Sequence, residues 1–215
     1  MKHLGLDEEG RPEFNWAGHK VRLELRGRQN ARNAVLAMGL ARAWGVTPAE
    51  AVAAVATVQP LPMRGNILRY GNLMVIADCY NSNPGSLDSA LDLLLSIPRR
   101  GGRVAVLGSM LELGSREADL HAAAAEKLAE AELDLIVATG LFVPAFERLA
   151  ADMGKRLVMA VDPLDAADLL RQRLAGNEVV LLKGSRGVAL ERLLEVLKDE
   201  HGPAGSGTGA SWPEV

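Results

Sequence analysis

The amino-acid sequence predicts an α/β fold with a doubly wound, mostly parallel sheet and helices on both faces. Short apolar runs recur along most of the chain, amphipathic stretches separate them, and polar turns follow several runs. Continuous rather than alternating hydrophobicity is typical of parallel strands, because helices cover both faces of such a sheet. The alternation of strands and helices favours right-handed crossover connections.

The predicted strands are five short runs rich in branched side chains: residues 73–77, 104–107, 135–138, 157–161 and 179–182. Apolar residues at helical spacing form stripes between and after these runs: Leu87, Ala90, Leu91 and Leu94; Leu120, Ala124 and Leu128; Leu190, Leu193, Leu194 and Leu197. Asp162 and Pro163 supply an N-cap and a first-turn proline for one more helix.

Residues 1–59 have a mixed pattern that predicts a small α+β domain. Alternation predicts a hairpin of strands 14–16 and 21–25, joined by a turn at 17–19. Two helices follow. The first has an apolar face and ends near Gly45, and the second begins at Thr47 and Pro48; the first face is Ala31, Ala34, Val35 and Met38.

Prolines at positions 60 and 62 cannot continue a helix, because proline lacks an amide hydrogen and clashes with the preceding turn. The domain boundary is therefore predicted there, with a second domain over residues 60–200. The tail, residues 201–215, is rich in Gly, Ser and Pro and is expected to be disordered.

Composition limits the class of protein. The chain has 215 residues, is 48% hydrophobic and has a formal net charge of −3, which is too balanced for a nucleic-acid-binding surface. Cys79 is the only cysteine, which rules out an intramolecular disulfide and agrees with a reducing cytoplasm. No window reaches the 18 or so apolar residues of a membrane span, so no membrane association is expected.

Polar turns follow three of the predicted strands. The first is Asp78-Cys79-Tyr80-Asn81-Ser82-Asn83-Pro84, and the others are residues 108–112 and 183–187. A carboxylate can accept both hydroxyls of a ribose, whereas Lys and Arg beside exposed amides can hold a phosphate or carboxylate. Because open α/β sheets bind ligands at the carboxyl ends of their strands, these turns predict one site for an anionic or nucleotide ligand.

Each of these features also has a structural interpretation. Asp78 can cap its own turn, Asn83 can be a helix N-cap before Pro84, and residues 183–187 can be a plain glycine-rich turn. His121 lies in a predicted helix, where a lone histidine is more often structural than a metal ligand. No Gly-x-x-x-x-Gly-Lys-Ser/Thr sequence occurs, so this sequence supplies no P-loop.

Four ordered segments carry a resemblance: residues 27–34, 78–86, 107–114 with His121, and 180–187. In that order they resemble the later motifs of the muramyl peptide ligases, the Mur ligase family, over about residues 11–197. The string Tyr80-Asn81-Ser82-Asn83-Pro84 favours the dipeptide-adding branch, because the amino-acid-adding branch generally has a histidine in this turn. The resemblance implies a C-terminal Rossmann-like domain preceded by an α+β remnant of the central ATPase domain.

The resemblance also implies a reaction in peptidoglycan precursor synthesis, and hence a contribution to cell-wall formation, cell shape and division. An ATP-dependent, Mg²⁺-assisted ligase of this branch forms the amide bond that adds D-Ala-D-Ala to a UDP-N-acetylmuramoyl tripeptide. Since the P-loop is missing, the chain is expected to be a fragment or split part. Another chain would then carry the P-loop, the UDP-binding domain and most Mg²⁺ ligands.

By the same resemblance, the expected ATP contacts are Asn30, Asn33, Arg64 and Asp78, with Asn30 on adenine, Arg64 on the phosphates and Asp78 on the ribose. The expected catalytic residues are Arg64, Asp78 and Lys183, and no metal ligand is expected on this chain. The residues expected to line the crevice for the dipeptide and acceptor are Tyr80, Asn81, Asn83, Ser109, Glu112, Lys183, Ser185 and Arg186.

Three alternatives stay open at the level of the sequence. The chain can be a non-catalytic module that binds a nucleotide or dipeptide. It can also belong to a relative, either the diaminopimelate- or lysine-adding ligase or folylpolyglutamate synthase.

Overall fold

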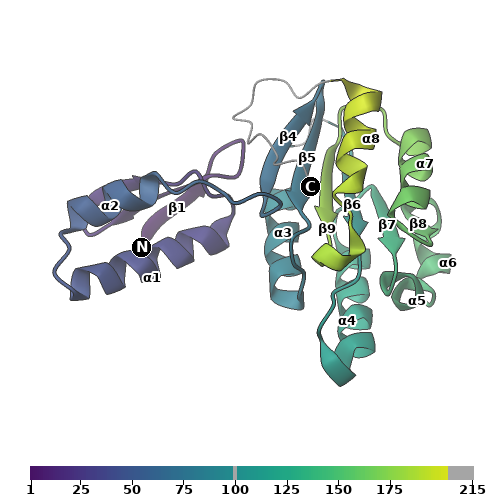
Figure 1. Ribbon diagram of the computed structural model, residues 1–215, viewed down its shortest axis with the longest axis horizontal. Coiled ribbons are helices and arrows are strands. Elements are labelled where there is room, and N and C mark those ends of the chain that lie inside the picture. Colours follow the sequence, from purple (N-terminus) through teal and green to yellow (C-terminus); the bar gives the residue numbers. More distant parts are fainter. Residues whose placement is uncertain (99–100, 203–215) are drawn as a thin grey trace. The chain divides into compact units, whose positions relative to one another are not determined.

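A computed structural model describes residues 1–98 and 101–202 of the chain (Figure 1). The described residues form two compact units, one of Met1–Leu61 with Ser96–Pro98 and the other of residues 62–95 and 101–202. The predicted assignment of residues 1–59 and 60–200 to two Mur ligase domains stays a prediction. Most of the predicted disordered tail, beyond Gly202, lies outside the described residues.

The first unit contains a three-stranded antiparallel sheet in the order β1-β2-β3, with β1 at Lys2–Leu6, β2 at Pro12–Trp16 and β3 at His19–Arg22. The hairpin is confirmed, but β3 ends at Arg22, earlier than predicted. Leu23 donates its N–H to the carbonyl of Pro12, and proline has no N–H with which to continue the ladder. β1 was not predicted, and its pairing with β2 has a shift in register between Lys2 and Gly5.

Both predicted helices of the first unit are present, α1 at Arg28–Ala43 and α2 at Pro48–Ala56. One face of α1 packs on the sheet in a core that includes Phe14, Val21, Leu23, Ala31, Ala34 and Met38. α2 begins with a reciprocal capping box between Thr47 and Glu50, and the hydrogen bonds from Thr47 lower the pKa of the Glu50 carboxyl.

The second unit contains a six-stranded sheet in the order β4-β5-β9-β6-β7-β8 (Figure 1). The five predicted runs are confirmed as its parallel strands: β5 at Leu73–Asp78, β6 at Arg103–Leu107, β7 at Leu135–Thr139, β8 at Leu157–Ala160 and β9 at Val179–Lys183. β4, at Asn66–Tyr70, pairs antiparallel with β5 and was not predicted. Its sequence, NILRY, lacks a clear apolar alternation.

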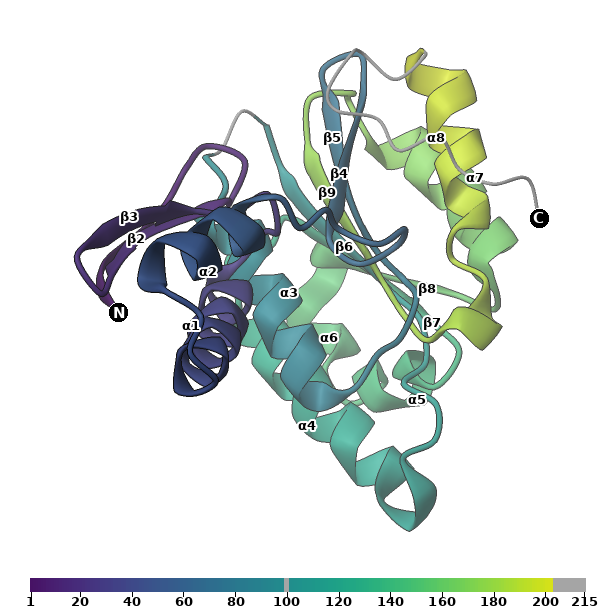
Figure 2. The ribbon, with the colours of Figure 1, turned by 60° about the vertical axis from the view of Figure 1, so that its left-hand side comes forward.

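Helices cover both faces of this sheet, as predicted. Figure 2 shows α7 and α8 on one face and α3 and α4 on the other. β9 lies between β5 and β6, so the connection from β8 to β9 crosses the sheet in the direction opposite to that of the earlier connections. A right-handed crossover in that direction puts α7 on the face of the sheet opposite α3 and α4. The helices are α3 at Pro84–Ser96, α4 at Glu117–Glu130, α5 at Phe142–Phe146, α6 at Ala150–Met153, α7 at Pro163–Arg173 and α8 at Arg192–His201.

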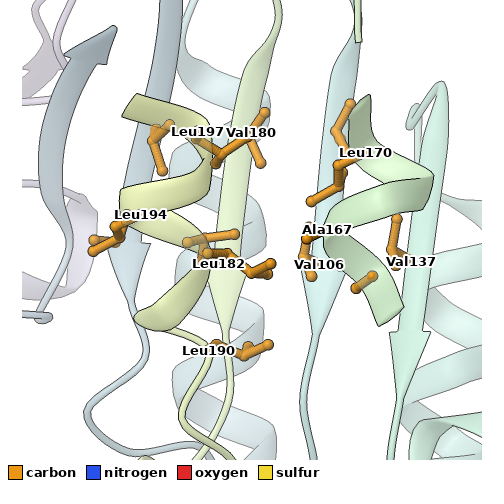
Figure 3. Close-up of a cluster of buried hydrophobic side chains, with 14 of the residues drawn as sticks. Val106, Val137, Ala167, Leu170, Val180, Leu182, Leu190, Leu194 and Leu197 are labelled. Atoms are coloured by element: carbon orange, nitrogen blue, oxygen red, sulfur yellow. The ribbon is translucent and has the colours of Figure 1, made fainter. Parts of the chain in front are cut away.

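The core beneath α7 and α8 joins side chains of both helices to the valines and leucines of β6, β7 and β9 (Figure 3). The prediction that every strand is buried on both faces is wrong for residues 157–161. β8 lies at the edge of the sheet, with a neighbouring strand on one side only, and both Met159 within it and Val161 just after it are exposed. No helix in the described part of the chain is long and apolar enough to cross a membrane.

The structural interpretation of Asn83 is confirmed at the start of α3. Its Oδ1 accepts the Ser86 N–H at 2.9 Å, and its own N–H donates to the Ser86 hydroxyl at 3.0 Å. This reciprocal pair satisfies amide groups that the first turn of a helix leaves without partners.

We expect Asn83→Ala to lower the free energy of unfolding by about 1 kcal/mol, because it removes the side-chain acceptor of the cap. Asn83→Ser keeps an acceptor oxygen and should stay close to the original stability. Urea unfolding followed by circular dichroism measures both. Equal stability of the Ala and Ser variants would show that the cap contributes nothing.

Candidate functional site

The loops that follow β5, β9 and β6 lie next to one another at the carboxyl ends of these strands, as the sequence predicts. In the strand register Asp78 faces Lys183, and Lys183 also faces Leu107. After β5 the chain enters α3, whereas after β9 it enters α8 on the opposite face. This divergence is the switch point at which open α/β sheets bind their ligands.

Lys183 is the centre of this arrangement. Its side chain is only 1% exposed, and its ammonium lies 3.0 Å from Asp78 Oδ2. The ammonium also donates to the backbone carbonyls of Asp78, at 3.3 Å, and of Asn81. A buried ammonium needs such partners, because leaving water without them costs several kcal/mol. Lys183 therefore fixes the turn from Asp78 to Asn81 onto β9.

The turn fixed by Lys183 carries Tyr80, whose exposed ring contacts two guanidinium groups. The Arg64 Cζ lies 4.3 Å from the ring centroid, and the Arg186 Cζ lies 5.6 Å from it. Arg64 precedes β4 and Arg186 follows β9, so residues far apart in the sequence form one cationic cluster around one ring. We call it the Arg64–Tyr80–Arg186 cluster. Such a pair of guanidiniums can bind a phosphate or carboxylate.

Ser109 and Ser185, two predicted substrate residues, are buried and join neighbouring loops. The Leu111 N–H donates to Ser185 Oγ at 3.0 Å, and the Ser185 N–H donates to the Ser109 carbonyl at 3.0 Å. Ser109 Oγ in turn accepts the Leu141 N–H at 2.9 Å. The two hydroxyls thus hold the loops of β6, β7 and β9 together.

Two glycines allow the loops after β6 and β9 to approach each other. A Cβ on Gly184 would lie 3.2 Å from Gly108 Cα and 2.9 Å from Leu190 Cδ1. A Cβ on Gly108 would lie 2.8 Å from Val188 Cγ1. Any larger residue at either position would therefore push these loops apart.

His121 has the structural role that its position in a helix suggested. Its buried ring accepts the Met110 N–H at Nε2, at 2.9 Å, and faces the Glu117 carbonyl at 2.7 Å with Nδ1. Because a backbone N–H can only donate, these partners select the neutral tautomer with the proton on Nδ1. His121 also packs edge-on against Phe142, with ring centroids 4.9 Å apart.

Cys79 is buried, and the carboxylate that acts on it most strongly is Glu191, which sequence reasoning missed. Burial, followed by the nearby carboxylates of Glu191 and Asp78, raises the pKa of the Cys79 thiol to about 12. One buried oxygen of Glu191 has no hydrogen-bond partner among the described residues. No sequence signal marks it, because a glutamate before a helix is common.

The remaining predicted residues are placed as follows. Asn81 and Glu112 are exposed, and Glu112 has a left-handed backbone with φ of 65°. Asn30 and Asn33 lie on α1 of the first unit, where Asn30 Nδ2 donates to the Arg26 carbonyl at 2.8 Å and Asn33 Nδ2 to Asn30 Oδ1 at 3.4 Å. The predicted ATP contacts are thus divided between the two units.

Metal ligands do not gather anywhere in residues 1–98 and 101–202, where no group of three His, Cys, Asp or Glu side chains could hold an ion. A hollow of about 300 Å³ lies between the start of α4 and α5, and no predicted site residue lines it.

Residues 63–186, which include the whole Arg64–Tyr80–Arg186 cluster, match the family model described as "Mur ligase, glutamate ligase domain". The chain belongs to the Mur ligase family. The family predicted from the four motifs is therefore confirmed.

The UDP-N-acetylmuramoyl-tripeptide--D-alanyl-D-alanine ligase of Treponema pallidum (strain Nichols) is 32% identical over 187 residues, covering 86% of this chain and 40% of that protein. MurF from Acinetobacter baumannii superposes with a TM-score of 0.79 at 29% identity, over 92% of this chain and 44% of that chain. The MurF ligase of Thermotoga maritima, solved in complex with ADP, has a TM-score of 0.75 at 26% identity, over 93% of this chain and 45% of that chain. This Mur ligase chain thus spans less than half the length of each relative.

Lys183→Met should lower the free energy of unfolding by about 3 kcal/mol, because it removes one partner of a buried ion pair. Lys198→Met, which removes an exposed lysine paired with Glu195 at 3.3 Å, is the matched control and should change stability by less than about 0.5 kcal/mol. Urea titration measures both variants. Similar stabilities for the two would contradict the central role of Lys183.

Cys79 should react slowly with a thiol reagent such as dithionitrobenzoate at pH 8 in the native protein, because its raised pKa and burial keep it protonated and covered. In guanidinium chloride the same thiol should react at the rate of a free cysteine. Since this is the only cysteine in the chain, the absorbance change reports on it alone. Rapid reaction of the native protein would contradict its burial.

Proposed function

We propose that the chain is the C-terminal part of a ligase that adds D-Ala-D-Ala to a UDP-N-acetylmuramoyl tripeptide in the cytoplasm, in an ATP-dependent step of peptidoglycan synthesis. The observation that carries the proposal is the Arg64–Tyr80–Arg186 cluster beside the carboxylate of Asp78, at the switch point and within the matched family region. The names of the relatives supply the substrates.

The proposed reaction needs cationic groups at this position. ATP supplies the phosphoryl group that activates the terminal carboxylate of the tripeptide as an acyl phosphate. The amine of D-Ala-D-Ala attacks the carbonyl carbon, the new C–N bond forms, the C–O bond to phosphate breaks, and the amine loses its proton. Negative charge grows on the carbonyl and phosphate oxygens, where fixed guanidinium groups lower the barrier.

The geometry supports distinct tasks for the predicted residues. Arg64 is proposed to bind phosphate oxygens, and Asp78, whose side chain is 22% exposed, to accept the ribose hydroxyls. Lys183 is proposed to position the Asp78 turn, because its ammonium already bonds to the protein. Asn30 and Asn33 are proposed to contact the adenine side.

Contacts to the dipeptide and the acceptor are proposed for the exposed residues Tyr80, Asn81, Glu112 and Arg186. Ser109 and Ser185 are buried in contacts between loops, and Asn83 caps α3, so their proposed contribution is to hold the exposed residues in place. The P-loop and the Mg²⁺ ligands are proposed to come from the part of the ligase that the relatives have in addition.

A second candidate function is a module that binds a nucleotide or dipeptide without catalysis. The observation that favours it is the lack of a P-loop sequence in these 215 residues. No observation favours the diaminopimelate- or lysine-adding ligase or folylpolyglutamate synthase.

A chimera tests the proposal, with the unmatched N-terminal part of the Treponema pallidum ligase fused to this chain. It should convert UDP-N-acetylmuramoyl tripeptide, ATP and D-Ala-D-Ala to the pentapeptide product and ADP, as measured by mass spectrometry. Arg64→Ala should lower kcat/KM by about 100-fold or more, since it removes a charge that stabilises the transition state.

Tyr80→Phe keeps the ring and should retain most of the activity, whereas Tyr80→Leu removes the ring that both arginines contact and should lose it. Calorimetry on the unfused chain with ADP and with D-Ala-D-Ala separates the two candidates. Binding of either ligand by the chain, together with no product from a folded chimera, would favour the binding module.

A further inference from the structure

A network of charged side chains joins the turn between β1 and β2 to the segment that enters α1. The Glu9 carboxylate bridges two guanidinium groups, because its Oε2 lies 2.7 Å from a nitrogen of Arg11 and 3.5 Å from one of Arg26. The Arg11 Nε also lies 3.5 Å from the Glu24 carboxylate. The Arg26 side chain is only 7% exposed. We call these four residues the Glu9 network.

The Glu9 network fixes conformation more than it adds stability. Burial lowers the pKa of the Arg26 guanidinium, and the Glu9 carboxylate acts in the opposite direction. The buried Nε atoms of Arg11 and Arg26 have no hydrogen-bond partner within the described residues. A buried ion pair adds little net stability when its donors are not all satisfied. It does restrict the chain, because a buried guanidinium must stay beside its carboxylate.

The turn that carries Glu9 is held together by hydrogen bonds and contacts the first residue of α1. Asp7 Oδ1 accepts the N–H groups of Glu9, at 2.9 Å, and Arg11, at 2.8 Å. The Gly10 carbonyl accepts the N–H of Gly27, the N-cap of α1, at 2.8 Å. Because glycine has no side chain with which to cap the helix, this contact holds the start of α1 in place.

Arg26 determines how the side chain of Asn30 is turned. Its backbone carbonyl lies 2.8 Å from Asn30 Nδ2. A carbonyl oxygen can only accept a hydrogen bond, so the amide nitrogen must face it and Oδ1 must point away from it. The only printed donor to this Oδ1 is Asn33 Nδ2, at 3.4 Å, and an amide oxygen can accept a second, shorter hydrogen bond. Asn30 is partly buried and therefore offers an acceptor in a fixed direction.

We propose that Glu9 and Arg26 are positioning residues that set the preference of the ligase for adenine. This inference rests on the contact between Asn30 and adenine proposed above. Adenine carries an amino group, a donor, where guanine carries a carbonyl group, an acceptor. An Asn30 amide held with Oδ1 free to accept can pair with the amino group but not with the carbonyl. The Glu9 carboxylate fixes this orientation by holding Arg26.

Steady-state kinetics of the chimera described above, with ATP and with GTP, test the proposal. Arg26→Met should raise KM for ATP about tenfold, the loss expected when one hydrogen bond is misaligned. Its kcat with ATP should change by less than about twofold, whereas the ratio of kcat/KM for ATP to that for GTP should fall about tenfold. Arg26→Lys keeps a cation beside Glu9 and should restore most of the preference for ATP.

Glu9→Gln tests the same ion pair from its other side. It should lower the ATP-to-GTP ratio as Arg26→Met does, and the double variant should be no worse than either single variant, because both act through one interaction. Circular dichroism checks that each variant folds. Glu9→Gln, which keeps the shape of the side chain, decides the outcome if Arg26→Met does not fold.

Lys20→Met is the matched control on the same small sheet. Glu13 keeps Arg22, at 3.6 Å, when Lys20, at 3.0 Å, is removed. Arg26→Met likewise leaves Glu9 with another guanidinium. The control should therefore leave KM, kcat and the ATP-to-GTP ratio unchanged. An equal fall of the ratio in the control would contradict the proposal.

NMR of the full chain gives a readout that needs no catalysis. The Asn30 side-chain amide proton that is bonded to the Arg26 carbonyl, assigned by its loss in Asn30→Ser, should be shifted downfield. Arg26→Met should move it towards its position in the unfolded chain, and Lys20→Met should not.

The proposal is overturned if the ATP-to-GTP ratio stays the same in folded, active Arg26→Met and Glu9→Gln variants. It is also overturned if kcat falls alike with both nucleotides, as a general loss of structure would cause. An inactive parent chimera would reject the function proposed above. In that case a shifted Asn30 resonance in Arg26→Met would still support the positioning step, and an unchanged resonance would reject it.

Discussion

The buried ammonium of Lys183 is the constraint on which the rest of the site depends. It sits at the end of a central strand, out of water, so the protein must surround it with acceptors. The Asp78 carboxylate and the carbonyls of Asp78 and Asn81 fill that need, which fixes the backbone on both sides of Tyr80. The ring on this turn is then in place for Arg64 and Arg186. The Lys183 ammonium thus positions the exposed side chains of this turn without having to touch a ligand itself.

Sheet topology decides which loops can take part. β9 is the last strand in sequence but lies between β5 and β6, so its loop enters between two loops that come earlier in the chain. Such close neighbours need small residues, and Gly108 and Gly184 meet where any Cβ would collide. The buried hydroxyls of Ser109 and Ser185 hold these loops together by hydrogen bonds rather than by the packing of large side chains. Rigid support of this kind keeps a binding site in its working geometry.

The first unit shows a different constraint, that of a small sheet with two helices. Its core takes one side of α1 and leaves Leu36, Leu40 and Trp44 on the other side exposed. A unit of this size buries little apolar surface by itself.

The sequence by itself determined the five parallel strands, the first hairpin, the main helices and the identity of the site loops. Those properties depend on local patterns, such as the continuous apolar run of β5 and the Asn83–Pro84 helix start. Local patterns could not reveal β4 or the exposed edge at β8, because strand pairing and position within the sheet decide both.

Only the tertiary structure decided that Lys183 turns inwards, that Ser109 and Ser185 hold loops rather than face solvent, and that Arg64 and Arg186 share the ring of Tyr80. Lys183 and Asp78 are 105 residues apart, and nothing in either local sequence specifies the other. Contacts of that kind arise when the sheet assembles, since strand register brings the two residues opposite each other and burial then selects the partners of the charge.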